Sequence, residues 1–360
     1  MQFRTRRMDP GDEPIVNDLF NELVKGTLPP RSLDVMRRIW HEGPGGPVLS
    51  WVAETRADHG GWRIVAHHGL CPVRYTLGDK DLVFAKTVNS FLLPEFRGKF
   101  LYLRFEKRCL AEAEELFDAT YTLLSERAKL RASLHYDLNL RSLSLEKGLL
   151  RPSTLCRLLV RLAWRYPRFP AQRVVRAFRG APPRSGAPLR LMEFDNRAAT
   201  SSTFFATFWD EARLTAGLAP RRDAADLSWR FWKMPGARRT TLAHTWPDGV
   251  RGYCIIDHTN PLHFTLEDIF LARSRPEFLQ QFLDAIFAWC RDQGALLLCF
   301  WTAAEGQPLD LMHIYRSNFG VSFSRRHPDG PLPRRLTQRG RERLGTEWPD
   351  CNVTSIIGPA

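Results

Sequence analysis

The stretch LPEFRGKFLYLRFEKRCLAEAEE, residues 93–115, predicts a strand that passes through a sharp turn directly into a helix. Residues 81–93 lead into this turn and are rich in Val, Phe, Thr and Leu, which is typical of a mostly buried strand. From Leu101 onward, apolar residues recur at helical spacing, while charged residues occupy the other faces. The helix would begin with unpaired N–H groups beside the positive charges of Arg97 and Lys99. This arrangement predicts a phosphate-binding turn.

Residues 94–99, Pro-Glu-Phe-Arg-Gly-Lys, resemble the Pro-Glu-Tyr-Arg-Gly-Lys-Gly motif of the GNAT (Gcn5-related) N-acyltransferases. In that family the motif follows a central strand, and its amides hold the pantetheine diphosphate of an acyl-CoA. Glycine lets a backbone approach a phosphate closely, yet Phe100 and Tyr102 stand where the family prefers glycine or another small residue. The resemblance implies that a donor contacts the strand end, the turn and the helix start, at Phe91, Leu93, Arg97, Gly98, Lys99, Phe100 and Leu101.

The elements that flank the motif occur in GNAT order. They are an opening strand, two helices, three strands expected to be antiparallel, the turn and a long helix, with the helices and strands at residues 15–23, 32–40, 49–55, 62–75 and 81–93. A strand over 119–125 and a helix over 133–147 follow. Residues 145–149, Leu-Glu-Lys-Gly-Leu, resemble the family's Tyr-Glu-Lys-x-Gly-Phe ending, in which a Tyr often acts as general acid. Ser144 occupies the place of that Tyr.

The second half also resembles a GNAT-like domain. Residues 221–235, RRDAADLSWRFWKMP, resemble a signature of the second half of tandem GNAT-like proteins, many from bacterial polysaccharide and lipid-modification loci. Strands are expected over 189–194, 240–246, 252–257, 264–270 and 295–301, and helices over 202–214 and from Ser274, which begins a capping box, to Gly294. No Arg-Gly-x-Gly precedes the last helix, so this half is expected to be degenerate.

At 360 residues the chain is long enough for two domains, each with its own core. We expect an α/β (α+β) fold of two GNAT-like domains, each a mixed, mostly antiparallel sheet flanked by helices. The first spans 1–150 and the second 189–360. A basic amphipathic connector spans 151–188, where prolines and an APPRSGAP linker interrupt an apolar stripe.

The formal net charge of +13 is concentrated in two segments. Residues 147–192 contain Lys147, ten arginines and no acid, and residues 321–343 contain seven arginines against two acids. Arginines at positions 157, 161 and 165 form one face of a helix. Such a surface suits an acidic acyl-carrier protein or an anionic membrane, which residues 151–179 would contact, with nucleic acid the least favoured partner. A connecting helix with solvated arginines explains the same pattern.

Cysteine and histidine usage indicates a reducing compartment and no metal. Seven scattered cysteines form no Cys-x-x-Cys pair, so we expect a cytoplasmic protein with free thiols. No stretch approaches about 18 uninterrupted apolar residues, so we expect no membrane-spanning helix, and we expect no secretory signal. His67 and His68 are adjacent in a predicted strand, so their side chains should point to opposite faces and not chelate one ion.

The resemblance implies transfer of an acyl group from acyl-CoA, or from the phosphopantetheine of an acyl-carrier protein, to an amine on a small molecule, saccharide or lipid. A base must take the amine proton. Candidate proton-transfer residues are Glu95 at the strand end, Asp268 in a strand of the second half, and Tyr315 near the end of its matching helix. Two alternatives remain open. One is a Fem-type aminoacyl transferase, and the other is a catalytically silent binding protein, which Phe100, Tyr102 and Ser144 favour.

Overall fold

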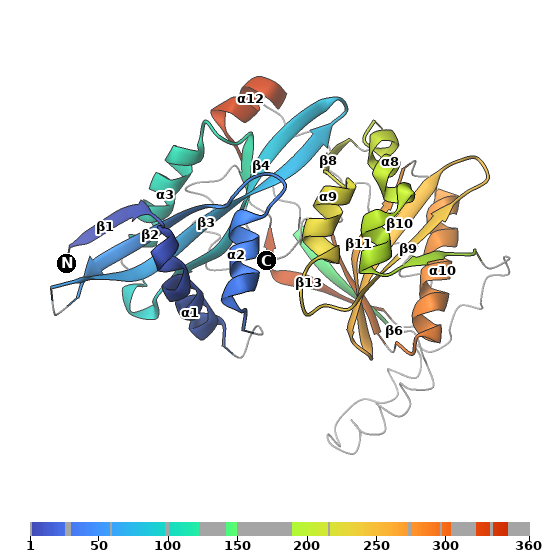
Figure 1. The fold of residues 1–360 in the computed structure, drawn as a ribbon, viewed down its shortest axis with the longest axis horizontal. Helices are drawn as coiled ribbons and strands as arrows, with labels where there is room; N and C mark the ends of the chain where they lie inside the picture. Colours follow the sequence, from blue (N-terminus) through green and yellow to red (C-terminus); the bar gives the residue numbers. More distant parts are fainter. Residues whose placement is uncertain are drawn as a thin grey trace, which may run out of the picture. The chain divides into compact units, whose positions relative to one another are not determined.

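A computed structural model of the chain describes residues 2–25, 30–57, 60–97, 101–121, 142–149, 189–214, 217–272, 276–295, 297–303, 322–331 and 334–344. These residues form two compact units (Figure 1). Each unit is a mixed sheet flanked by helices, which confirms the α/β fold with two GNAT-like sheets. The connector expected over 151–188 lies outside the described residues.

Unit 1 follows the element order predicted for the first half. Its elements are β1 (Phe3–Arg7), η1 (Pro10–Asp12), α1 (Glu13–Val24), α2 (Leu33–His41), β2 (Leu49–Arg56), β3 (Trp62–Leu77), β4 (Lys80–Leu92), η2 (Pro94–Phe96), α3 (Leu101–Ala113), β5 (Ala119–Tyr121), β14 (Arg334–Leu336) and α12 (Gln338–Leu344). Along the sheet the strands run β1-β2-β3-β4-β5-β14. Neighbours are antiparallel except β4 and β5, which are parallel because α3 connects them as a crossover helix.

The core of unit 1 explains why α3 forms where the sequence predicts it. One face of α3 carries Phe105, Cys109 and Leu110, all buried, and packs on Trp51 and Leu70 from the sheet. On the N-terminal side, Ser32 caps α2 by accepting a hydrogen bond from the Val35 amide at 3.3 Å. The packing of α3 fixes the helix of the strand-to-helix region that the sequence singles out.

Unit 2 repeats the same plan. Its elements are β6 (Ser142–Leu149), β7 (Met192–Phe194), α7 (Asn196–Ser201), α8 (Thr203–Ala212), β8 (Leu218–Pro220), α9 (Ala224–Leu227), the π-helical turn η4 (Ser228–Trp232), β9 (Arg239–Thr245), β10 (Arg251–Asn260), β11 (His263–Leu271), α10 (Pro276–Asp292), β12 (Leu297–Ala303) and β13 (Ser322–Pro331). The strand order is β13-β6-β12-β11-β10-β9-β7. Here β11, α10 and β12 form the parallel crossover that β4, α3 and β5 form in unit 1.

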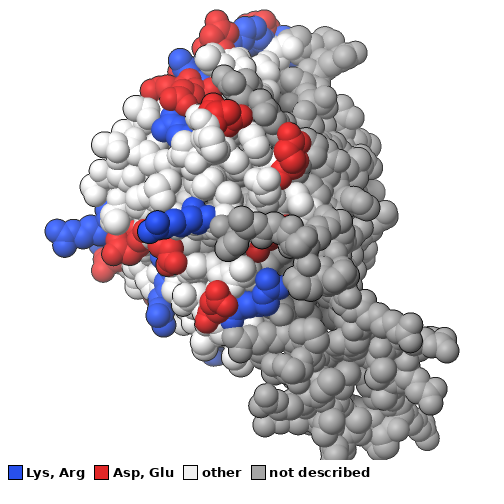
Figure 2. Space-filling model, turned by 90° about the vertical axis from the view of Figure 1, so that its right-hand side faces the viewer, with Lys and Arg blue, Asp and Glu red and all other residues white. Residues whose placement is uncertain are grey.

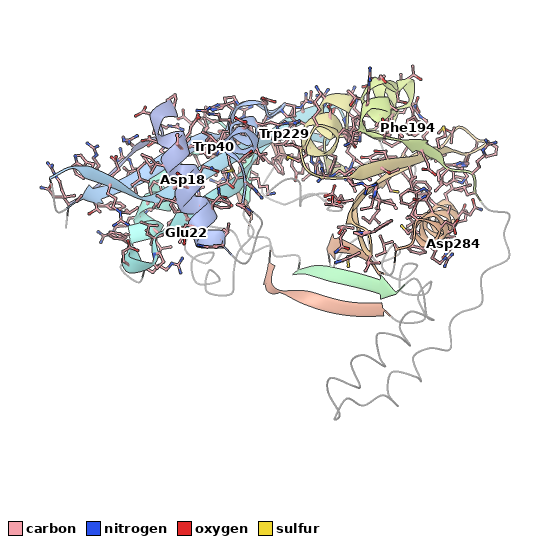
Figure 3. The ribbon with its side chains drawn as sticks, turned by 60° about the horizontal axis from the view of Figure 1, so that its bottom comes forward. Asp18, Glu22, Trp40, Phe194, Trp229 and Asp284 are labelled. Carbon is pink, nitrogen blue, oxygen red and sulfur yellow. The ribbon has the colours of Figure 1, made fainter. Side chains whose placement is uncertain are left out.

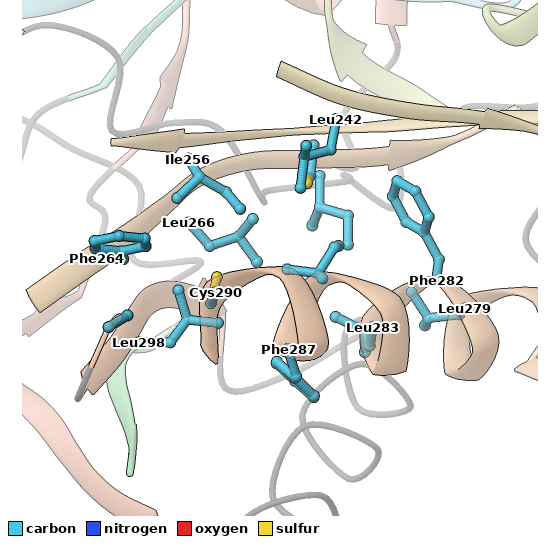
Figure 4. Close-up of a cluster of buried hydrophobic side chains, with 14 of the residues drawn as sticks. Leu242, Ile256, Phe264, Leu266, Leu279, Phe282, Leu283, Phe287, Cys290 and Leu298 are labelled. Atoms are coloured by element: carbon cyan, nitrogen blue, oxygen red, sulfur yellow. The ribbon is translucent and has the colours of Figure 1, made fainter. Parts of the chain in front are cut away.

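The helix α10 buries one broad apolar face against the sheet of unit 2, as its spacing predicts. Figure 4 shows helix residues such as Phe282, Leu283 and Cys290 facing strand residues such as Leu242 and Ile256. All five are fully buried. Because burying a large apolar side chain contributes roughly 1.5–3 kcal/mol, this layer is a main source of stability for the unit.

Two strands lie in the unit opposite to the one that their place in the chain suggests. β6 comes from the first half but pairs with β12, and β14 comes from the C-terminal end but pairs with β5. Figure 1 shows β6 in green beside the red and orange strands of unit 2, and α12 in red beside α3. The described parts of unit 1 thus come from residues 1–140 and 331–349, and those of unit 2 from residues 141–330. Pairing between residues far apart in the chain, not chain order, sets their composition.

The helix expected over 133–147 is wrong in its described part, because residues 142–149 form β6. The local pattern Ser-Leu-Ser-Leu over 142–145 alternates polar and apolar residues, which is a strand period. The strand expected over 119–125 is confirmed for Ala119–Tyr121, where its described residues end.

Candidate functional site

The described pairing of β4 with β5 covers the middle of β4. It runs from Phe84 opposite Ala119 to Lys86 opposite Tyr121, where the described residues of β5 end, while β4 continues to Leu92. The end of β4 is fixed by its pairing with β3 and by the turn that follows it.

On the side of β4 that faces away from β3, particular main-chain groups can be assigned. The Leu93 amide donates to the Val65 carbonyl of β3 at 2.9 Å. Because successive residues of a strand turn their N–H and C=O groups to opposite sides, those of Leu92 point away from β3. An extended molecule with amide groups could pair with this edge as a strand does.

A β-bulge interrupts β4 just before this edge. His68 of β3 stands opposite both Asn89 and Ser90, since the register shifts between His67 and Gly69. Asn89 has a φ of 51°, in the left-handed region that Asn tolerates better than most residues. Its carbonyl accepts a hydrogen bond from Nδ1 of His67 at 2.9 Å. A carbonyl only accepts, so Nδ1 of His67 carries the proton.

His67 and His68 point to opposite faces of the sheet, as their adjacency predicts. His67 packs near Trp40 of α2, with ring centroids 6.2 Å apart; Trp40 is labelled in Figure 3. His68 packs on the α3 side against Phe105, with centroids 6.3 Å apart. Both imidazoles are fully buried. Burial lowers the pKa of His67 to about 4, so this ring is neutral near pH 7.

On the α3 face, one imidazole joins the bulge to the helix. Nδ1 of His68 lies 3.0 Å from the Tyr102 hydroxyl and 3.1 Å from Oγ of Ser90. Tyr102 lies in the first turn of α3 and is nearly buried. The bulge and the start of α3 are therefore connected through side chains.

The turn between β4 and α3, where the sequence predicts phosphate binding, is described in part. After η2, the Arg97 amide donates to the Pro94 carbonyl at 3.1 Å, and the exposed Arg97 side chain places Nε 3.4 Å from the Leu92 carbonyl. Phe91 and Leu93 are buried at the strand end, and Leu101 begins α3. Of the seven expected donor contacts, Gly98, Lys99 and Phe100 lie outside the described residues.

Comparison with known proteins decides the fold. No protein-family model and no curated protein matches the sequence. Among solved structures, a probable N-acyltransferase from Enterococcus faecalis V583 has a TM-score of 0.63 at 10% identity, over 94% of this chain and 74% of that one. A GCN5-related N-acetyltransferase from Anabaena variabilis ATCC 29413 has a TM-score of 0.59 at 11% identity, over 94% and 73%.

The chain has the GNAT fold.

A third neighbour extends the comparison. Saccharomyces cerevisiae N-myristoyltransferase, with bound myristoyl-CoA and inhibitors, has a TM-score of 0.51 at 11% identity, over 93% of this chain and 80% of that one. At such identities the likeness concerns the fold alone. Within this GNAT fold, the C-terminal end of β4, the bulge and the start of α3 form the candidate donor site of unit 1.

The three candidate proton-transfer residues have different surroundings. Glu95 lies in η2 at the end of β4, about half exposed, and forms an ion pair with Arg63 at 3.1 Å. Tyr315 lies outside the described residues. Asp268 belongs to unit 2, where it is fully buried.

Asp268 is held by two strong partners. Its carboxylate accepts from Nε of Arg222 at 3.2 Å and from the Tyr253 hydroxyl at 2.7 Å. Arg222 is also fully buried, and its guanidinium lies over Phe270. The neighbouring Asp223 caps α9 by accepting from the Asp226 amide at 2.9 Å. The residues of the 221–235 signature thus secure the interior of unit 2.

The bulge with Ser90, His68 and Tyr102 is the part of the site that sequence reasoning misses. The only local signal is Asn89, a residue type that is uncommon in strands and that tolerates the left-handed region. Tyr102 stands out only as a departure from the family motif. The contacts themselves depend on which residue of β3 faces the bulge.

Possible metal ligands, helix hydrophobicity and surface charge complete the description of the described residues. No group of three or more His, Cys, Asp or Glu side chains suited to a metal ion occurs among the described residues. None of the described helices is long and apolar enough to span a membrane. On the face that Figure 2 presents, acidic and basic side chains are interspersed among uncharged ones. Most of the basic segment 147–192 lies outside the described residues.

Proposed function

We propose that the chain is an N-acyltransferase that binds an acyl-CoA at the C-terminal end of β4 in unit 1. The observation that carries this proposal is the bulge in β4, followed by main-chain groups turned away from β3 and a short turn into α3. This geometry supplies a strand edge beside a helix start. A donor with amides and a diphosphate needs both features.

The residues would share the donor as follows. The N–H groups at the start of α3 and the Arg97 guanidinium would attract the diphosphate. The main-chain groups of Leu92 would pair with the pantetheine amides, which would bring the thioester toward Asn89 and Ser90. An amine nitrogen then attacks the thioester carbonyl, the C–S bond breaks, and the thiol leaves with the proton that the amine loses.

Proton transfer is assigned by position. Glu95 stands at the end of β4 and is the proposed base of unit 1. Tyr315, which the sequence predicts as an acid, lies outside the described residues. The buried ion pair of Asp268 with Arg222 supports a structural role for this carboxylate instead. Arg222 and Tyr253 already donate to its oxygens and would compete with a substrate amine for them. Turnover should therefore depend on Glu95 more than on any other acid of unit 1.

The donor and the acceptor are finer parts of the same proposal. We propose acyl-CoA as the first donor to test, with an acidic acyl-carrier protein as the alternative that the arginine-rich segment 151–188 favours. The acceptor would be an amine on a small molecule, saccharide or lipid, the last presented at a membrane surface that residues 151–179 contact. A panel of acyl-CoA and acyl-carrier thioesters, read by mass spectrometry, distinguishes these donors.

Calorimetric titration with CoA tests the proposed site directly. The wild type should bind, and the double variant Arg97→Ala, Gly98→Asp should lose at least about tenfold in affinity, since it removes a cation and adds a repelling charge. Arg108→Ala is the matched control, because Arg108 is exposed further along α3 and pairs with Glu112 at 3.7 Å. Absence of CoA binding in the wild type, or equal binding by the double variant, would refute the proposal.

A catalytically silent binding protein is the second candidate. The buried Tyr102 favours it, because an aromatic ring fills the first turn of α3 where the family prefers a small residue. This candidate predicts CoA binding without turnover of any thioester. Product detected by mass spectrometry from any acyl-CoA and amine pair would exclude it.

A further inference from the structure

His68 lies where the two parts of the proposed donor site meet. Its Nδ1 atom is within hydrogen-bond distance of Tyr102 from α3 and of Ser90 from the bulge. The imidazole is fully buried between Trp51, Tyr102 and Phe105, with ring centroids 6.2–6.5 Å away. Packing of this kind leaves the ring little freedom to move.

The geometry connects two main-chain segments that bind different parts of a donor. Tyr102 lies one residue after the start of α3, and Ser90 lies in the bulge of β4. Since both hydroxyls share one nitrogen of a fixed ring, a shift of either segment would break a buried hydrogen bond. Leaving a buried polar group without its partner is unfavourable, so the two segments hold each other in place.

We infer that His68, Tyr102 and Ser90 act as positioning residues that set the spacing between the start of α3 and the bulge. This inference rests on the proposed function. It gives a role to Tyr102, whose hydroxyl reaches a partner that a small residue could not. We call these three hydrogen-bonded residues the brace. In this chain the brace accompanies a Tyr at position 102, where the family motif has a small residue.

The spacing between two subsites matters only to a ligand that spans them. ADP would occupy the turn alone, whereas acetyl-CoA would occupy the turn, the strand edge and the bulge. Loosening the brace should therefore weaken acetyl-CoA binding and leave ADP binding unchanged. A residue with a merely structural role would weaken both ligands together or neither.

The experiment compares the two ligands by calorimetry on Tyr102→Phe, Ser90→Ala and the double variant. Each single variant should weaken acetyl-CoA binding by about tenfold and change ADP binding by less than about twofold. The double variant should be no weaker than the weaker single variant, because both changes act through His68. His68→Asn keeps a polar atom near the position of Nδ1 and should retain more acetyl-CoA affinity than His68→Leu.

Tyr75→Phe is the control for loss of a buried phenol, since Tyr75 lies on β3 and stacks on Phe84, away from the bulge. Equal loss of both ligands, no loss of acetyl-CoA affinity, or additive losses in the double variant would overturn the inference. If the wild type binds neither ligand, the proposed function itself fails. These outcomes are distinct, so the two proposals can be judged separately.

Discussion

The buried imidazole of His67 makes the stability of unit 1 depend on pH. Its ordinary pKa is 6.5, and burial lowers it to about 4. In the unfolded chain His67 therefore binds a proton below pH 6.5, whereas in the folded chain it binds one only below about pH 4. Stability from this residue is complete above pH 6.5 and falls as the pH drops to 4, by about 3 kcal/mol in all.

Urea unfolding measured between pH 7 and 4 checks this effect. His67→Asn is the informative control, because an amide can still donate to the Asn89 carbonyl but does not titrate. The variant should lose the part of the pH dependence that lies between 6.5 and 4. An identical slope in wild type and variant would show that His67 is not its source.

The Arg222–Asp268 pair gives a second prediction at the scale of single residues. Asp268→Asn leaves the guanidinium of Arg222 buried without its counter-charge, so the free energy of unfolding should fall by about 3–5 kcal/mol. Chemical denaturation measures this, with Asp292→Asn at the exposed end of α10 as the control. A stable variant that loses only acyl transfer would instead indicate that Asp268 has a catalytic role.

At the scale of elements, α12 depends on one close approach. Arg339 and Arg343 of α12 reach the buried carboxylate of Asp118 at 3.2 and 3.0 Å. Between them, a Cβ at Gly340 would overlap the Asp118 carbonyl oxygen, far inside van der Waals contact. Because this neighbour is main chain and cannot yield, Gly340→Ala should displace α12 and destabilise unit 1 by about 1–3 kcal/mol or more.

Thermal unfolding and amide hydrogen exchange can test the Gly340 prediction. Loss of protection should centre on β5, β14 and α12. Gly61→Ala is the matched control, since nothing lies within 4 Å of a Cβ at that position. Equal melting temperatures for the two variants would contradict the close approach.

The elements that sequence predicts well are those whose signals are local. β2, β3 and β4 are apolar runs separated by glycine-containing turns, and α2 and α10 show their apolar faces at helical spacing. The sequence predicts a helix where β6 lies, because the two-residue alternation of this strand is short and residues 145–149 resemble a family ending. The bulge at Asn89 has almost no local signal, because it depends on the register with β3. Register is set by packing across the sheet.

The same reasoning explains which part of the candidate site was predictable. Arg97 and the start of α3 follow from a short contiguous motif. The brace of Ser90, His68 and Tyr102 joins three segments, and no spacing along the chain indicates their contact. His67 and His68 could be assigned to opposite faces by alternation, but their partners could not. Contiguous motifs are readable from sequence, and contacts between segments require the fold.

At the scale of the whole molecule, the exchanged strands make each unit depend on both halves of the chain. Unit 1 needs β14 and α12 beside β5, and unit 2 needs β6 beside β12. A fragment of residues 1–188 lacks β14 and α12, so the edge of β5 and the carboxylate of Asp118 lose their partners. A fragment of residues 189–360 lacks β6, which leaves one side of β12 unpaired in the middle of its sheet. Unpaired strands of this kind favour aggregation.

We therefore predict that neither fragment folds cooperatively alone, whereas the two fragments produced together recover the fold. Circular dichroism during heating would show one sharp transition for the intact chain and for the mixed fragments, and broad or absent transitions for each fragment. A circularly permuted chain that moves residues 331–360 to the N-terminus would serve as a control, since it keeps β14 and α12 in the same molecule. Independent cooperative folding of residues 1–188 would contradict this prediction, because it would show that unit 1 folds without β14 and α12.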